Sequence, residues 1–217
     1  LINFIRKNEY NIFSIPGPCS AIAGISLSGL KTDKFLLKAA NKCDGINEVY
    51  EELKKIKLSA EKIILTGKGR VSDGALEILR RVNIKEVSKE EFVTKTFNES
   101  VFRSLNTMDY NERIDGALSD KYDFYNNPEK YQSSFLNYTK HADIFIAGHF
   151  YGSGSPYLFT REDAKSDDFN LQVVADISCD IDGPVASTIR SSTITNPIYG
   201  YNTETELEDD FKKRGVI

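Results

Sequence analysis

The sequence has 217 residues, of which 40% are hydrophobic and 28% charged, as is ordinary for a globular protein of one large or two small domains. The formal net charge is only -4 and both signs are mixed along the chain, so we expect no nucleic-acid partner. No apolar run approaches the roughly 20 residues that a membrane helix needs, so we expect no membrane partner either. The three cysteines, Cys19, Cys43 and Cys179, are far apart and odd in number, which favours a reducing cytoplasm over a disulfide framework.

Residues 1–37 predict a short α/β segment, with a strand over 11–15 and a helix of small residues that ends near Gly29. Two stretches, SIPGPCSAI and SGLKTDKF, resemble ribosomal-RNA ribose methyltransferases of the tetrapyrrole methylase family. The resemblance covers only this part of the chain. We therefore interpret residues 1–37 as an appended methyltransferase-like fragment, and a remnant that binds S-adenosylmethionine is one hypothesis for its function.

A strand, a glycine turn and a helix are predicted between residues 62 and 82. The apolar run Ile63 to Leu65 ends at a glycine, and the apolar spacing then changes to the helix period at Val71, Ala75, Ile78, Leu79 and Val82. Glycines let the backbone approach a phosphate, and the unpaired amides of the first helical turn favour negative charge. The sequence therefore predicts a dinucleotide pocket that includes Gly67, Gly69, Arg70, Val71 and Gly74.

A second short strand is predicted over residues 84–88, which completes a β-α-β unit. In such a unit an acid at the end of the second strand binds the adenosine ribose hydroxyls. Glu86 is the nearest candidate, and Ser88 is the alternative at the tip of the strand. Because Ser88 would leave less negative charge against a 2′-phosphate, the choice between NAD and NADP stays open.

The middle of the chain predicts a strand at Val101 to Leu105 and then a polar, tyrosine-rich insertion up to residue 127. This insertion is either a lid or a long loop. A helix is predicted from Glu129 to His141. Its aromatic stripe, at Tyr131, Phe135 and Tyr138, is typical of a core-facing side.

Two later strands are predicted to end in polar residues. The first is the apolar run 143–150, which contains Gly148 and His149, and its composition is typical of a strand covered on both faces. Since ligands sit at the carboxyl ends of such strands, His149 is placed to reach a nicotinamide or a substrate, with a structural role as the alternative. Between the two strands, Thr160 and Asp163 resemble a capping box that opens a short helix.

The second of these strands begins near Leu171 and delivers Asp176, Asp180 and Asp182 into one loop, with Ile177 beside them. No histidine or second acidic cluster lies near in sequence, so we predict no metal site. A carboxylate beside a dihydronicotinamide can instead assist proton transfer.

Residues 38–217 resemble the nucleotide-binding domain of the saccharopine dehydrogenase, alanine dehydrogenase and transhydrogenase group. The motifs that carry this resemblance are ILTGKGRVSDGALEIL, DIFIAGHF, LFTREDAKS, VVADISCDIDGP and STITNPIYGY. The resemblance implies an α/β fold with a Rossmann-type parallel sheet covered by helices on both faces. It also implies NAD, or NADP, as cofactor and hydride transfer between an amino acid or secondary amine and a 2-oxo acid.

The same resemblance implies roles for individual residues. Gly67, Gly69, Arg70 and Gly74 fall on the pyrophosphate turn, and His149 falls at the strand end that skirts the nicotinamide. Gly148, Asp176 and Ile177 are also expected to bind the cofactor, with an orienting role as the alternative for Asp176. His149 and Asp180 are the candidate catalytic residues.

In this group the substrate domain comes from the chain before and after the nucleotide-binding domain. We therefore interpret residues 38–217 as an NAD(P)-binding domain that is truncated at its C-terminal end. The alternative function is an NAD-binding module without catalytic activity. The choice of amino-acid substrate and the formation of a homo-oligomer are left open, and we expect a cytoplasmic location.

Overall fold

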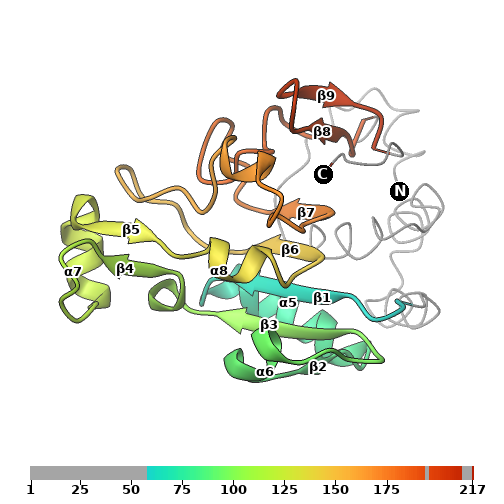
Figure 1. Ribbon diagram of the computed structural model, residues 1–217, viewed down its shortest axis with the longest axis horizontal. Coiled ribbons are helices and arrows are strands. Elements are labelled where there is room, and N and C mark those ends of the chain that lie inside the picture. The colour runs from blue at the N-terminus through green and yellow to red at the C-terminus, as the bar shows by residue number, and fades with distance from the viewer. Residues whose placement is uncertain (1–57, 194–195, 212–216) are drawn as a thin grey trace, which may run out of the picture.

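The computed structural model describes residues 58–193, 196–211 and 217. The predicted methyltransferase-like fragment, residues 1–37, lies outside the described residues. A five-stranded, wholly parallel sheet forms the centre of the described part (Figure 1). Its strands, in spatial order, are β2 (Lys85–Glu86), β3 (Val101–Leu105), β1 (Lys62–Thr66), β6 (Ile144–Ala147) and β7 (Val173–Asp176).

Helices cover both faces of this sheet, and as a result every residue of the central strand from Ile63 onward is buried. Ile63 and Leu65 of β1 pack against the apolar side of α5 (Arg70–Arg81) in one core cluster. Ile64, which points the other way, packs in a second cluster with Phe92 of α6 (Lys89–Thr94) and Tyr138 of α8 (Leu136–Thr139). The predicted α/β fold of the Rossmann type, with helices on both faces, is confirmed.

The helix that follows the glycine turn has a clear beginning and a clear apolar side. Gly69 is its N-cap, and the Gly69 amide donates to the Ser72 hydroxyl at 3.0 Å while that hydroxyl donates to the Gly69 carbonyl at 3.0 Å. The buried residues of α5 repeat at the helical period: Ser72, Ala75, Leu76, Ile78 and Leu79. The predicted strand, turn and helix over residues 62–82 are therefore confirmed.

The strand order corrects the expected β-α-β unit. The strand beside β1 is β3, with Lys62 opposite Val101, and β2 pairs only with the outer edge of β3. In the usual Rossmann order the second strand lies next to the first. Here β2 is a strand of two exposed residues at the edge of the sheet.

The insertion after β3 has secondary structure of its own, and Figure 1 shows it set apart from the main sheet. It contains η1 (Thr107–Asp109), β4 (Asn111–Arg113), α7 (Lys121–Asn126), η2 (Pro128–Lys130) and β5 (Tyr131–Ser133). Strands β4 and β5 form an antiparallel hairpin. The insertion is therefore a folded hairpin with a short helix and not an irregular loop.

The prediction of one helix from Glu129 to His141 is wrong. Tyr131 is extended and pairs with Arg113 across the hairpin, and only α8 is helical in the second half of the predicted range. The Tyr131 hydroxyl donates to Asp123 at 3.0 Å, so a contact across the insertion holds this residue in the strand. The stripe itself is buried as predicted, because Tyr131, Phe135 and Tyr138 all lie in the core.

Two smaller features complete the fold. The predicted capping box opens η3 (Asp163–Lys165), where the Thr160 amide donates to Asp163 at 2.8 Å and the Asp163 amide donates back to the Thr160 hydroxyl at 3.2 Å. A hairpin of β8 (Gly200–Asn202) and β9 (Leu207–Asp209) was not predicted, and its buried Tyr201 exchanges backbone hydrogen bonds with Ile217. Within the described ranges, no helix has the length and apolar character needed to cross a membrane.

Candidate functional site

The loops that follow β1 and β6 meet at the point where the strand order reverses. Strands β1, β2 and β3 lie to one side of this point, whereas β6 and β7 continue the sheet on the other side. At such a point the chain leaves neighbouring strands in opposite directions, and a crevice opens beyond their carboxyl ends. This is where parallel α/β sheets bind ligands.

Gly67 and Gly148 touch each other at this place, which we call the switch point. Gly67 has a φ of +106°, and a Cβ atom on it would lie 2.4 Å from the carbonyl oxygen of Gly148. A Cβ atom on Gly148 would in turn lie 2.9 Å from the carbonyl oxygen of Thr66. Both positions therefore require glycine for reasons internal to the fold, namely a left-handed turn and a close backbone approach.

Gly69 is different, because nothing in the fold requires a glycine there. Its backbone is extended, and a Cβ atom on it would meet no atom of the described residues within 4 Å. The first helical hydrogen bond of α5 runs from the Asp73 amide to the Gly69 carbonyl at 2.9 Å, so the amides of Arg70 and Val71 have no partner within the helix. The start of α5 is therefore open and positively polarised. Gly74, by contrast, lies in the second turn of α5, away from this opening.

His149 follows β6 and is buried, with only 8% of its surface exposed. The Nδ1 atom lies 2.8 Å from the Thr66 hydroxyl at the end of β1. The edge of the ring contacts Tyr110, with 6.3 Å between ring centroids. The other ring nitrogen, Nε2, is buried and has no hydrogen-bond partner among the described residues.

Burial lowers the pKa of His149 to about 4, although the nearby Asp176 carboxylate acts in the opposite direction. At neutral pH the imidazole is therefore uncharged. A neutral imidazole with one nitrogen held and the other unpaired can donate or accept one hydrogen bond at a ligand.

Asp176 ends β7 and holds the loop that follows. Its carboxylate accepts hydrogen bonds from the Ser178 amide at 3.0 Å, the Ser178 hydroxyl at 2.6 Å and the Thr188 hydroxyl at 2.7 Å. The neighbouring Ile177 is buried in the cluster below α5. In this structure Asp176 orients the loop and Ile177 belongs to the core.

Asp180 lies on an exposed turn of the same loop, where the Gly183 amide donates to the Asp180 carbonyl at 3.0 Å. Partial burial and the nearby Asp176 carboxylate raise the pKa of Asp180. Asp182, the third acid of the loop, turns away to an ion pair with Arg161 at 2.7 Å. Across the part of the chain that the structure describes, no three His, Cys, Asp or Glu side chains converge as a metal-binding group.

The structure does not bring Glu86 and Ser88 to the switch point. Glu86 lies opposite Phe102, near the beginning of β3, and its carboxylate is 3.1 Å from the Arg80 guanidinium. Ser88 caps α6, where its hydroxyl accepts from the Glu91 amide at 3.1 Å. The residue that follows the strand beside β1 is Asn106.

Three residues that contact the site in the structure were not among the residues predicted for it from the sequence. Thr66 could have been found as the polar residue that ends an apolar strand just before the glycine turn. Tyr110 and Thr188 could not have been found in this way, because Tyr110 contacts His149 and Thr188 contacts Asp176 from distant parts of the chain.

The parallel sheet and the glycine turn at its switch point define an α/β domain of the Rossmann type. No family model matches the chain. The chain is 25% identical over 175 residues to an alpha-aminoadipic semialdehyde synthase of Arabidopsis thaliana, and the match covers 71% of this chain but only 16% of that protein. This remote similarity agrees with the resemblance that the motifs indicate, and it relates the chain to one segment of a much longer enzyme.

Proposed function

We propose that this chain is the NAD(P)-binding domain of an oxidoreductase that acts on an amino acid or a secondary amine. The observation that carries the proposal is the close contact of Gly67 with Gly148 at the switch point, beside which Gly69 stands open at the start of α5. The name of the plant relative, alpha-aminoadipic semialdehyde synthase, supports chemistry on an amino-acid-derived compound.

The residues at the switch point and at the start of α5 fit a dinucleotide. Gly69 leaves space for a pyrophosphate, and the unpaired amides of Arg70 and Val71 suit its negative charge. The nicotinamide group, when bound, supplies the hydride donor or acceptor. His149 would offer Nε2 to the carboxamide or to the substrate, and Asp180, exposed in the loop after β7, would serve as the proton-transferring group.

Titration with NADH and NADPH, followed by their fluorescence, tests the binding. The wild-type protein should bind at least one of them at micromolar to millimolar concentration. Gly69→Val should weaken binding at least about tenfold, because its side chain would occupy the approach to the helix amides. Thr96→Val, an exposed change before β3 at the other edge of the sheet, is the control and should leave binding unchanged.

Two further readouts separate the alternatives. Thr96→Val should unfold at the wild-type urea midpoint, and Gly69→Val should lose no more than about 1 kcal/mol, since valine is a poorer N-cap than glycine but neither position packs against the core. Absence of NADH and NADPH binding at millimolar concentration in the wild type would contradict the proposal. Binding without cofactor oxidation in the presence of lysine and 2-oxoglutarate would instead identify a nucleotide-binding module without this activity.

A further inference from the structure

The strand order moves the expected ribose-binding position from β2 to the end of β3. In Rossmann domains the adenosine ribose is bound by an acid at the end of the second strand, which lies beside the first. Here β3 occupies that place, and the Gly67 amide donates to the Leu105 carbonyl at 3.2 Å, which joins the glycine turn directly to the end of β3. The turn Asn106–Asp109 is therefore the part of the chain that borders the glycine turn on this side.

This turn offers no uncommitted carboxylate. One oxygen of Asp109 accepts from the Asn106 amide at 2.8 Å, and the other accepts from the Lys89 ammonium at 2.7 Å. Only 12% of the Asp109 side chain is exposed. Burial alone would raise the pKa of Asp109, but the hydrogen bonds from Lys89 and Asn106 outweigh it and lower the pKa. The carboxylate is ionised, neutralised and largely covered, so it cannot bind two ribose hydroxyls as a free acid does.

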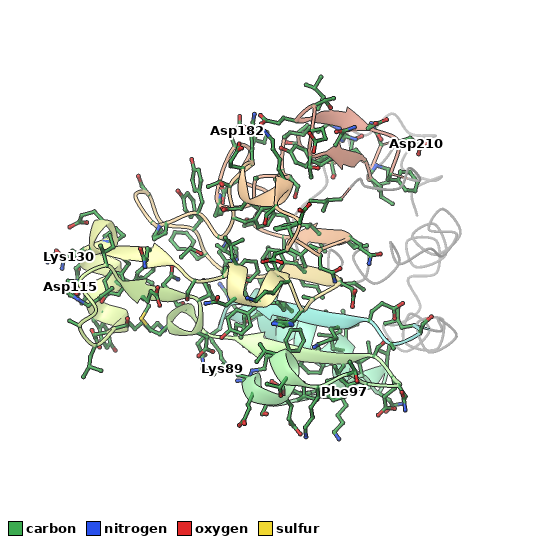
Figure 2. The ribbon with its side chains drawn as sticks, in the orientation of Figure 1. Lys89, Phe97, Asp115, Lys130, Asp182 and Asp210 are labelled. Carbon is green, nitrogen blue, oxygen red and sulfur yellow. The ribbon has the colours of Figure 1, made fainter. Side chains whose placement is uncertain are left out.

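Lys89 is accessible and stands at the carboxyl edge of the sheet. Its side chain is 48% exposed, and it begins α6 directly after Ser88. Figure 2 shows Lys89 and Phe97 toward opposite ends of α6 and β3, with Lys89 on the side of the insertion that follows β3. An ammonium group has three donors, and Asp109 accepts one of them. The remaining donors can pair with a phosphate.

A second cation lies behind the first. The Arg103 guanidinium on β3 donates to the Val87 carbonyl at 3.2 Å and lies 4.0 Å from Glu86. Its Nε atom is buried and has no partner within residues 58–193, 196–211 and 217. Arg103 is close enough to favour the ionised form of Asp109. The environment of the turn is therefore more favourable to an anion than that of an acid-tipped strand.

We propose that the turn Asn106–Asp109 is the adenosine-ribose subsite and that Lys89 beside it accepts a 2′-phosphate, so that the domain binds NADPH at least as tightly as NADH. The inference rests on the proposed function, because it assumes that the switch point binds a dinucleotide. It goes further by naming the residues that select between the two cofactors.

Dissociation constants for NADH and NADPH in four proteins test this inference. In the wild type, NADPH should bind at least as tightly as NADH. Lys89→Gln should weaken NADPH about tenfold, the loss of one charged hydrogen bond, and should change NADH less than about twofold. Asn106→Asp should also weaken NADPH about tenfold, because it places an unpaired carboxylate at the end of β3.

Lys95→Gln is the matched control. Lys95 lies at the other end of α6 and pairs with Glu91 at 3.0 Å, so the same loss of charge there should leave both constants unchanged. NADPH binding ten times weaker than NADH in the wild type would overturn the inference, as would an NADPH to NADH ratio that is the same in Lys89→Gln, Asn106→Asp and the control. Failure of both nucleotides to bind the wild type would instead contradict the proposed function itself.

Discussion

Thr66 and His149 are 83 residues apart in the sequence, and their side chains lie 2.8 Å apart in the core, from the Thr66 hydroxyl to Nδ1 of the imidazole. Thr66 ends the strand before the glycine turn, and His149 follows the strand that the turn touches. This contact therefore fixes the imidazole relative to the turn and leaves Nε2 as the buried ring nitrogen that has no hydrogen-bond partner among the described residues.

Replacing Thr66 with valine should destabilise the protein. Valine keeps the shape of the side chain but leaves Nδ1 of a buried histidine without a partner, which should lower the free energy of unfolding by about 1–3 kcal/mol. Thr66→Ser, which retains the hydroxyl, should stay closer to the wild type. Urea denaturation followed by circular dichroism measures both, and equal stability of the two variants would show that the hydrogen bond contributes nothing.

The stability of the protein should fall between pH 7 and pH 5 because of His149. The pKa of this residue is lowered to about 4 in the fold, against about 6.5 in an unfolded chain. As the pH falls through this window the unfolded chain takes up a proton that the folded protein does not, so unfolding becomes more favourable. The expected loss from this group is about 2 kcal/mol.

Urea midpoints at pH 7, 6 and 5 check this expectation in the wild type and in His149→Gln, which should lose less stability over the same range. His141→Gln is the control, since His141 is the other histidine of the chain and is more exposed. A pH dependence that is the same in wild type and His149→Gln would mean that burial of this imidazole does not control acid stability.

Gly67→Ala should be more damaging than a glycine substitution that only strains the backbone. An alanine Cβ would lie 2.4 Å from the Gly148 carbonyl at a φ of +106°. We expect the free energy of unfolding to fall by about 3 kcal/mol or more. Gly116→Ala also has a positive φ, +73°, but no atom within 4 Å of the new Cβ, so it should cost only about 1–2 kcal/mol. Equal losses in urea denaturation would argue against the close contact between the two turns.

The parts of the fold that could be predicted are those with a local pattern. The strand before Gly67, the helix after it and the strand Val101–Leu105 all follow from apolar spacing, and the covered sheet follows from strands that are apolar on both sides. The helix expected from Glu129 failed because its first half pairs with β4, a partner that lies earlier in the chain and is not visible in local spacing. A contact with a distant segment overrode the local preference.

The candidate site likewise contains residues that local sequence predicts and residues that only contacts between distant segments bring to it. Gly67 and Gly148 were predicted from composition at strand ends, and the structure brings them into contact. Glu86 was chosen as the acid nearest the end of the second predicted strand, but the order of strands along the chain cannot reveal which strand lies beside β1. The contributions of Tyr110 and Thr188 depend on tertiary contacts alone.

The register of β1 has a consequence for how the protein folds. Both neighbours of β1 come from much later in the chain: Glu61 accepts a hydrogen bond from Ser100, 39 residues on, and the Lys62 amide donates to Asp143, 81 residues on. Such non-local pairings form slowly, because the entropy of closing long loops is lost before the contacts are gained. During synthesis α5 can form as soon as it leaves the ribosome, but the turn at Gly67 reaches its final geometry only after Gly148 has emerged.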